Sequence, residues 1–206
     1  MLRALDRLRD YVLCALALGA DPRARGAILW RETKALRARL GLAAFHPTEV
    51  YALPTVYGRL YFRDNFGDIS NLVDLFYRRV YRVRSLSEEG VILDVGANIG
   101  LAAAWFAFHN RGRDIYCFEP LAASAALIKL NCPAAVVEPV AVGEQRGRVR
   151  LNVDRDQVMA SRIPCPWETV EAELDVVSLD EFARERGLDQ VALMKIDTEG
   201  MEMDVL

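Results

Sequence analysis

The segment Val91–Gly100, VILDVGANIG, limits the fold of this chain more than any other. Its short, almost continuously apolar run is typical of a parallel strand that is buried on both faces. Gly96 and Gly100 then allow a sharp turn and a close approach of the backbone to a ligand. The residues that follow, LAAAWFAFHN, favour a helix. The segment therefore predicts a strand, a glycine turn and a helix, which is half of a nucleotide-type pocket at the carboxyl end of a strand.

The spacing of this turn indicates which cofactor it suits. A dinucleotide fingerprint needs G-x-G-x-x-G, in which the middle glycine lets a pyrophosphate approach the backbone. Asn98 stands in the place of that middle glycine, between Gly96 and Gly100. Asp94, at the end of the strand, suits a cationic ligand better than a pyrophosphate. We therefore predict that Asp94, Gly96, Asn98 and Gly100 bind S-adenosylmethionine, a sulfonium without phosphate; a turn without any ligand is the alternative.

A second strand-like segment, Ile115–Pro120, reads IYCFEP and places Glu119 25 residues after Asp94. In a β-α-β unit, an acid at the tip of the second strand accepts hydrogen bonds from both hydroxyls of a ribose. We therefore predict that Glu119 holds the ribose of the cofactor. A solvated acid at the end of a strand is the plainer alternative.

A third strand-like segment, Val191–Ile196, is followed by a cluster of acidic residues. Asp197 and Glu199 come directly after the strand, so we expect them at the same carboxyl edge as the glycine turn. They are the candidates for binding the acceptor or for accepting its proton as catalytic base. For Glu202 and Asp204 we favour a solvated helix start.

Taken together, the motifs LDVGANIG, FEP, NCPAAVVEPVAVGEQRG, VSLDEF and KIDTEGMEMDVL resemble the FkbM family of class I S-adenosylmethionine-dependent methyltransferases. The resemblance implies a Rossmann-like α/β sheet and methylation of a hydroxyl on a small metabolite, sugar or polyketide. It also implies that Ala141 and Val142, after a third strand over 136–142, flank the adenine. Ala122 departs from the usual F-E-P-x-P of the family, which affects the turn rather than the chemistry.

The resemblance also predicts how the chain is divided. Residues 91–206 form the S-adenosylmethionine-binding methyltransferase core, 46–90 its amino-terminal part with a hairpin and a helix, and 1–45 a helical extension. The family continues into further strands, so the strand 191–196 is expected at an uncovered edge, which invites aggregation. We therefore expect the sheet to be incomplete and the chain to be truncated at its carboxyl end.

Local signals predict the elements that precede the glycine turn. Two helices over 1–42 are expected to break near Asp21–Pro22, with Asp21 as the cap of the second helix. An extended segment or hairpin is expected over 51–62 and a turn over 64–68. A helix over 72–83 would then start at a cap formed by Ser70 or Asn71. Residues 154–167 are expected to form a loop that covers the acceptor.

Charge and cysteine usage limit the possible partners. Residues 1–40 contain nine Arg or Lys and four Asp or Glu, a net charge of +5, within a chain of net charge −3. The acidic remainder disfavours a general nucleic-acid binder. For the basic start we favour a solvated helix face, and an acidic partner or a membrane surface is the alternative. Four separated cysteines without C-x-x-C spacing indicate a reduced, cytoplasmic chain without a metal site. The apolar stretch Tyr11–Ala20 is too short to span a bilayer.

Two other classes of protein are compatible with these patterns. A nicotinamide-dependent oxidoreductase is disfavoured by Asn98, and a non-catalytic fragment or binding module with the same fold is the other alternative. The leading prediction is an enzyme that methylates a small-molecule acceptor. The sequence does not identify that acceptor, the oligomeric state or the role of residues 1–45.

Overall fold

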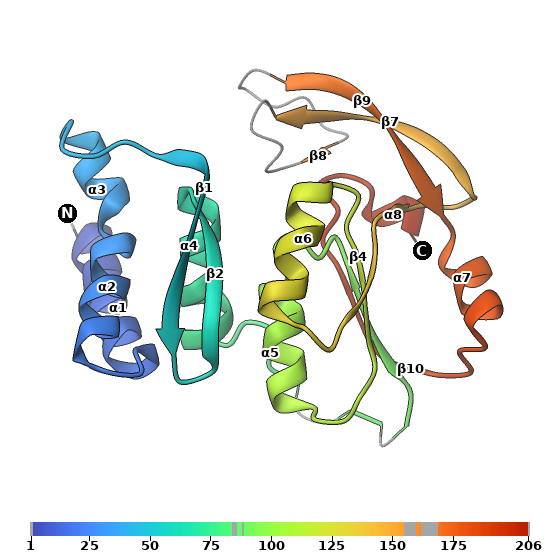
Figure 1. The fold of residues 1–206 in the computed structure, drawn as a ribbon, viewed down its shortest axis with the longest axis horizontal. Helices are drawn as coiled ribbons and strands as arrows, with labels where there is room; N and C mark the ends of the chain where they lie inside the picture. Colours follow the sequence, from blue (N-terminus) through green and yellow to red (C-terminus); the bar gives the residue numbers. More distant parts are fainter. Residues whose placement is uncertain (1, 84–85, 88, 155–159, 162–168, 206) are drawn as a thin grey trace. The chain divides into compact units, whose positions relative to one another are not determined.

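The computed structural model describes residues 2–83, 86–87, 89–154, 160–161 and 169–205. It divides into two compact units, Met1–Arg82 and Val83–Leu206. The chain is a mixed α/β protein, and its parallel sheet lies entirely in the second unit (Figure 1). Within the described residues, every helix is too short or too polar to cross a membrane.

The first unit begins with three helices, α1 (Leu2–Leu18), α2 (Pro22–Glu32) and α3 (Lys34–Arg39). The predicted break is confirmed, because the side chain of Asp21 accepts a hydrogen bond from the amide of Ala24 at 2.8 Å, and Pro22 opens α2. Strands β1 (His46–Thr55) and β2 (Gly58–Asp64) follow as an antiparallel hairpin, which confirms the predicted hairpin.

The helix after the hairpin starts earlier than predicted and also ends earlier. Helix α4 (Phe66–Asn71) continues as a π-helical turn, η1 (Leu72–Tyr77). The predicted cap at Ser70 or Asn71 is wrong, because the side chain of Asn65 caps α4 by accepting from the amide of Asp68 at 2.7 Å. The carboxylate of Asp68 is buried and paired with Arg63, and this pair holds the first turn of the helix in place.

The second unit contains a sheet of four parallel strands in the order β10-β3-β4-β5. Their bounds are Val191–Ile196 for β10, Val91–Val95 for β3, Ile115–Phe118 for β4 and Val136–Glu138 for β5. The predicted strand, turn and helix around Gly96 are confirmed, since α5 (Leu101–His109) begins directly after Gly100. The expectation that 191–196 lies at an edge is also confirmed, because β10 pairs only with β3 among the described strands.

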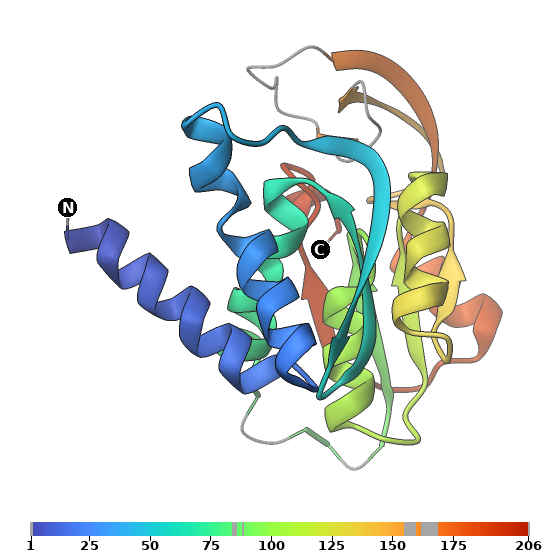
Figure 2. The same ribbon diagram turned by 60° about the vertical axis from the view of Figure 1, so that its left-hand side comes forward.

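Helices cover both faces of this sheet. Helices α5 and α6 (Ala122–Asn131) lie side by side over one face (Figures 1 and 2). Phe182 of α7 (Leu179–Arg186) packs against Leu93, Val95 and Phe118 on the opposite face. Because side chains alternate along a strand, Asp94 points to the face that carries α5 and α6. A short helix, α8 (Glu202–Val205), follows β10.

A separate sheet, in the order β6-β9-β7-β8, completes the second unit. Its strands are β6 (Ala141–Val142), β7 (Gly147–Asp154), β8 (Ala160–Ser161) and β9 (Thr169–Val177). A single strand over 136–142 was predicted, and this prediction is wrong. Strand β5 ends before Pro139, which has no amide to continue the ladder, and β6 pairs with β9 instead. Most of the predicted loop 154–167 lies outside the described residues.

Candidate functional site

The four parallel strands end in register at one edge of the sheet. Ile196 pairs with Val95, Val95 with Phe118, and Phe118 with Glu138. The residues that follow three of these strands are Asp197, Gly96 and Glu119. The structure therefore brings the glycine turn, the predicted ribose acid and the predicted acceptor acid to the same edge, where ligands of open α/β sheets bind.

Gly96 and Gly100 both adopt the left-handed backbone conformation, with φ of 73° and 80°. A Cβ atom on Gly96 would lie 1.9 Å from the carbonyl oxygen of Asp197, and one on Gly100 would lie 2.9 Å from Cα of Ile128 in α6. These contacts are shorter than real Cβ contacts. Both glycines are thus required by the packing of the protein itself, in addition to any ligand that approaches the turn.

Backbone amides of the turn donate to groups of the protein. The amides of Gly96 and Ala97 both donate to the carbonyl of Phe118 at 3.0 Å. The amide of Asn98, whose φ is 50°, donates to Oε2 of Glu119 at 2.8 Å. The turn is therefore bonded to the end of β4 through three consecutive amides.

Glu119 is held firmly at this edge. Only 7% of the residue is exposed, and its Oε1 accepts from the amide of Leu121 at 2.9 Å while its Oε2 accepts from Asn98. The alternative of a solvated acid is wrong. The carboxylate bonds to the turn after β3 and to the turn after β4, and its contact with a ribose stays a prediction.

Asp94 is fully buried and faces a cation of the chain itself. The Nζ atom of Lys195 on β10 lies 3.0 Å from Oδ1 of Asp94 and donates to the carbonyl of Gly96 at 2.6 Å. Sequence reasoning missed Lys195, although β10 and β3 are paired in a register that places it opposite Asp94. The cation that Asp94 faces in this structure is therefore the side chain of Lys195 rather than a ligand. Contact of Asp94 with the cofactor stays a prediction.

The acidic segment after β10 forms a turn that Glu202 organises. The carboxylate of Glu202 accepts from the amide of Thr198 at 3.0 Å and from that of Gly200 at 3.1 Å. Hydrogen bonds from backbone amides, the first from its own, lower the pKa of Glu202. The expected helix start at Glu202 is confirmed, since α8 begins there, but the carboxylate also accepts hydrogen bonds from the turn rather than being simply solvated.

Asp197 and Glu199 lie on this turn with their side chains exposed. Glu199 has a φ of 52°, and its carbonyl accepts from Oγ of Ser161 at 3.0 Å. Partial burial raises the pKa of the Glu199 carboxyl, and the negative charges of Asp197 and Glu202 raise it further. The group consequently releases its proton at a higher pH than an ordinary glutamate, which suits a catalytic base.

Ala141 and Val142 are placed differently from the other predicted residues. Pro139 and Val140 separate them from the end of β5, and their backbones form the β6–β9 ladder. Both side chains are buried, and Val142 belongs to the hydrophobic core under α7. Their contact with an adenine stays a prediction. A residue that the sequence reasoning missed is Asn131, whose Nδ2 donates to the carbonyl of Ile99 at 2.7 Å and so fixes the turn from α6.

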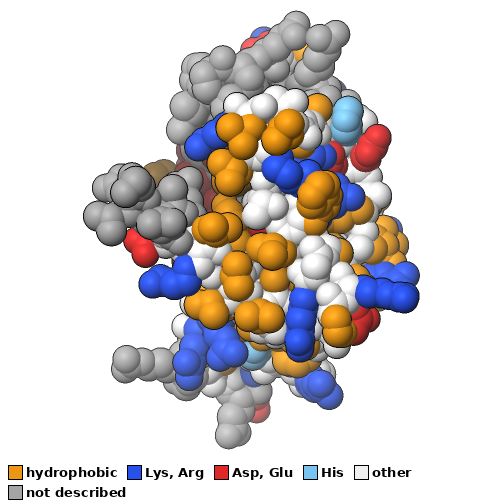
Figure 3. Space-filling view, turned by 90° about the vertical axis from the view of Figure 1, so that its left-hand side faces the viewer, with side chains coloured by type: hydrophobic (Ala, Val, Ile, Leu, Met, Phe, Trp, Pro, Cys, Tyr) orange, Lys and Arg blue, Asp and Glu red, His pale blue; other side chains and the backbone are white. Residues whose placement is uncertain are grey.

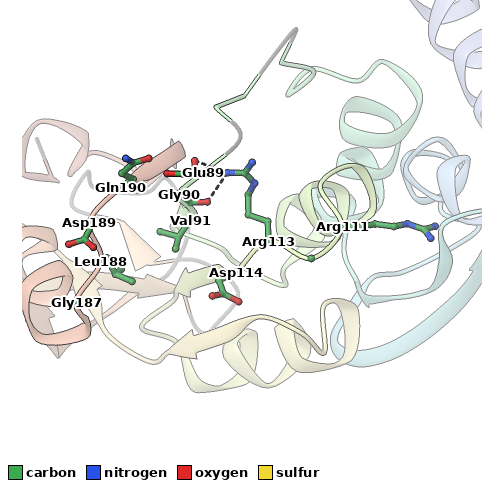
Figure 4. A pocket seen from close by; sticks show the side chains of 11 residues that line it. Glu89, Gly90, Val91, Arg111, Arg113, Asp114, Gly187, Leu188, Asp189 and Gln190 are labelled. Carbon is green, nitrogen blue, oxygen red and sulfur yellow. Dashed lines mark hydrogen bonds between the residues drawn. The ribbon is translucent and has the colours of Figure 1, made fainter.

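An open hollow of about 510 Å³ lies at the opposite edge of the sheet, where β3, β4 and β10 begin (Figure 4). The guanidinium of Arg113 donates to the carbonyls of Gly90 at 2.7 Å, Glu89 at 3.1 Å and Ser87 at 2.7 Å. Arg113 thus holds the segment that leads into β3. Because ligands of such sheets bind at the carboxyl ends of the strands, we do not assign the candidate site to this hollow.

Comparison with known proteins identifies relatives that share one activity in their names. The chain is 25% identical over 173 residues to the 31-O-demethyl-FK506 methyltransferase FkbM of Streptomyces tacrolimicus, covering 63% of this chain and 66% of that protein. It is 26% identical over 161 residues to Methyltransferase 1 of Beauveria bassiana, covering 65% of this chain and 64% of that protein. The matches thus span just under two thirds of the length of these curated relatives.

A solved structure and a family model also match. The crystal structure of Methyltransferase FkbM from Methylobacillus flagellatus KT covers 99% of this chain with 44% of its own chain, at 16% identity and a TM-score of 0.42. The model of the methyltransferase FkbM domain matches residues 94–206. Because that match extends over more than half of the sequence, the chain belongs to the FkbM methyltransferase family.

Proposed function

We propose that this chain is an S-adenosylmethionine-dependent methyltransferase that methylates a hydroxyl of a small molecule. The proposal includes a Rossmann-like class I sheet, in which the cofactor lies where the strand order reverses, between β3 and β10. Membership of the family supports the reaction class. The name of the Streptomyces relative supports an oxygen acceptor, since that protein is named for a 31-O-demethyl substrate.

The observation that carries the choice of cofactor is the use of the turn amides. A pyrophosphate binds to backbone amides that point at it from a glycine-rich turn. Here the amides of Gly96 and Ala97 donate to Phe118, and the amide of Asn98 donates to the carboxylate of Glu119. A carboxylate at that place repels a phosphate and accepts from a ribose hydroxyl. The arrangement therefore supports a cofactor without phosphate over a nicotinamide dinucleotide.

Different residues at the carboxyl edge are proposed to contact different parts of the cofactor. The carboxylate of Glu119, which accepts from the amides of Asn98 and Leu121, is the proposed acceptor for a ribose hydroxyl. In this proposal, the turn from Gly96 through Asn98 to Gly100 contacts the methionine end. Asp94 supports the turn indirectly, because it pairs with Lys195, whose Nζ donates to the carbonyl of Gly96. Ala141 and Val142 are the proposed neighbours of the adenine.

Asp197 and Glu199 are proposed to bind the acceptor and to take its proton. S-adenosylmethionine, when bound, supplies a methyl group carried by a positively charged sulfur. The acceptor oxygen attacks the methyl carbon in line with the carbon–sulfur bond, and the sulfur leaves as a neutral thioether. Glu199 is the favoured base, because its raised pKa brings it closer to that of the proton it must accept. Asp197, which is 58% exposed in its side chain, is available to orient the hydroxyl.

Replacing Glu119 tests the cofactor assignment. We expect Glu119→Gln to weaken S-adenosylmethionine about tenfold to a hundredfold, because a charge-assisted hydrogen bond contributes roughly 1.5–3 kcal/mol. Titration calorimetry with S-adenosylmethionine measures this change. The matched control is Glu171→Gln on the exposed face of β9, which should bind like the parent. An unchanged affinity in Glu119→Gln would contradict the ribose role.

The same calorimetry with NAD separates the alternatives. The proposed function requires binding of S-adenosylmethionine and no binding of NAD. Binding of NAD alone would favour the oxidoreductase. Binding of neither ligand by a folded chain would favour the non-catalytic binding module.

The pKa of Glu199 predicts the pH dependence of the reaction. A base must be deprotonated, so the rate should fall as the pH drops through the raised pKa of Glu199, above the usual glutamate value of about 4.3. With any alcohol that the enzyme methylates, we expect Glu199→Gln to lower kcat about a hundredfold and to remove this acid limb. Asp197→Asn should move the limb to lower pH, because it removes one of the charges that raise the pKa. If the acid limb of the pH–rate profile is unchanged in Glu199→Gln, a residue other than Glu199 is the base.

A further inference from the structure

The first unit exposes a face that is both apolar and basic. Figure 3 shows hydrophobic side chains gathered over the side that carries α1 to α3, with Lys and Arg side chains between and around them. We call this the basic apolar face. Among the described residues of 8–42, the large apolar side chains that are at least 38% exposed are Leu8, Val12, Leu13, Leu16, Trp30, Leu36, Leu40 and Leu42. Large apolar side chains that gather on one exposed face mark an interaction surface more often than chance exposure.

Helix α1 shows that packing within the unit does not account for this face. Its inner side is covered, since Cys14, Ala15 and Leu18 are buried. Leu8, Val12 and Leu16 recur every four residues along its outer side and are exposed. A surface helix normally has one apolar side, which faces the core. Packing against the core therefore does not explain why the outer side of α1 is apolar.

The charges of this region are strongly positive. Residues 1–40 carry a net charge of +5 when every acid is counted as ionised. Glu32 is buried, and burial raises its pKa to about 8, so at pH 7 this residue adds little negative charge. Arg23 and Arg39 are exposed and, within the described part of the chain, have no acidic partner. The guanidinium of Arg37 lies over the ring of Trp30, 3.4 Å from its centroid. Cations and exposed apolar groups are thus interleaved.

This combination fits one kind of partner best. Nucleic acid would satisfy the cations and leave the leucines in water. A second copy of the chain would cover the leucines, but a two-fold interface would place one basic face against another. An anionic lipid surface satisfies both, because leucines enter the boundary of the acyl chains, tryptophan lies at the headgroup level, and arginines meet the phosphates.

We propose that the basic apolar face of α1 to α3 docks on anionic membrane surfaces. Each Lys or Arg near such a surface strengthens binding about fivefold, which corresponds to roughly 1 kcal/mol. Salt weakens the contribution of these charges, because exposed charges are screened. The apolar side chains retain part of the binding at high salt.

Sedimentation of the full chain with lipid vesicles tests the proposal. We expect binding to vesicles of phosphatidylcholine mixed with phosphatidylglycerol, and at least tenfold weaker binding to phosphatidylcholine alone. The double variant Leu36→Ser, Leu40→Ser should weaken binding about tenfold through lost apolar contact, and Arg39→Gln about fivefold. The matched controls are Leu130→Ser and Lys129→Gln on the exposed side of α6, which should bind like the parent.

Several results would overturn the proposal. Equal binding to both kinds of vesicle, or equal losses in the control variants, would show that this face does not recognise an anionic surface. Absence of vesicle binding together with a dimer that Leu36→Ser, Leu40→Ser dissociates, measured by light scattering, would assign the face to a second copy. Circular dichroism melts of each variant establish that the losses do not come from unfolding.

Discussion

The Gly96→Ala variant is expected to destabilise the second unit strongly, because the added Cβ meets both an unfavourable backbone conformation and a neighbouring carbonyl. The left-handed backbone at this position costs an alanine about 1–2 kcal/mol. The new Cβ would lie 1.9 Å from the carbonyl oxygen of Asp197, and relieving such an overlap costs roughly 1–3 kcal/mol more. The sum of these terms, about 2–5 kcal/mol, is a large share of the stability of a typical domain. Urea denaturation followed by circular dichroism measures the change.

Gly112→Ala is the matched control for this substitution. Gly112 has a φ of 80°, close to the 73° of Gly96, and no atom lies within 4 Å of its added Cβ. The control therefore carries the backbone strain without the overlap and should lose only about 1–2 kcal/mol. Equal losses in the two variants would mean that β10 does not pass as close to the turn as the structure places it.

Lys195→Met is expected to destabilise the second unit by about 3–5 kcal/mol, because removing one partner of a buried ion pair leaves the other charge uncompensated. Asp94 is fully buried, and the Lys195 side chain is 9% exposed, so little water reaches the pair. The same substitution also removes the hydrogen bond from Nζ to the carbonyl of Gly96, which holds the glycine turn to β10.

Two further variants isolate the effect of the pair. Arg148→Met breaks ion pairs between exposed groups in the same unit and should cost at most about 1 kcal/mol. The double variant Asp94→Asn, Lys195→Met removes both charges and should recover part of the loss of Lys195→Met. Urea denaturation of the parent, Lys195→Met, the double variant and Arg148→Met measures these losses. A loss in Lys195→Met no larger than that in Arg148→Met would contradict a buried pair.

Local patterns in the sequence determined a large part of the fold. The apolar run before Gly96 predicted β3, and the helix formers after Gly100 predicted α5. Asp21 and Pro22 marked the start of α2 correctly, because a capping side chain and a proline act within one turn of the helix. The order of the motifs was also sufficient to identify the family that the comparison found.

Where an element begins and ends depended on partners that are not local. Asn65 and Asp68 read as a turn, and they became a helix start because Asp68 is paired with Arg63 in the core. Ala141 and Val142 read as the end of a strand, and they pair instead with β9, more than thirty residues later. Patterns of local hydrophobicity carry no information on such partners.

The sequence by itself determined which chemical groups stand at the candidate site, because the acids and glycines follow recognisable strands. Only the tertiary structure decided what each group contacts. It placed Lys195 against Asp94, bonded Glu119 to the amide of Asn98, and used Glu202 to shape the turn that carries Glu199. The physical reason is that burial, ion pairing and the pKa of a carboxylate depend on neighbours that adjacent strands bring together, and the register of those strands is set by the packing of the whole sheet.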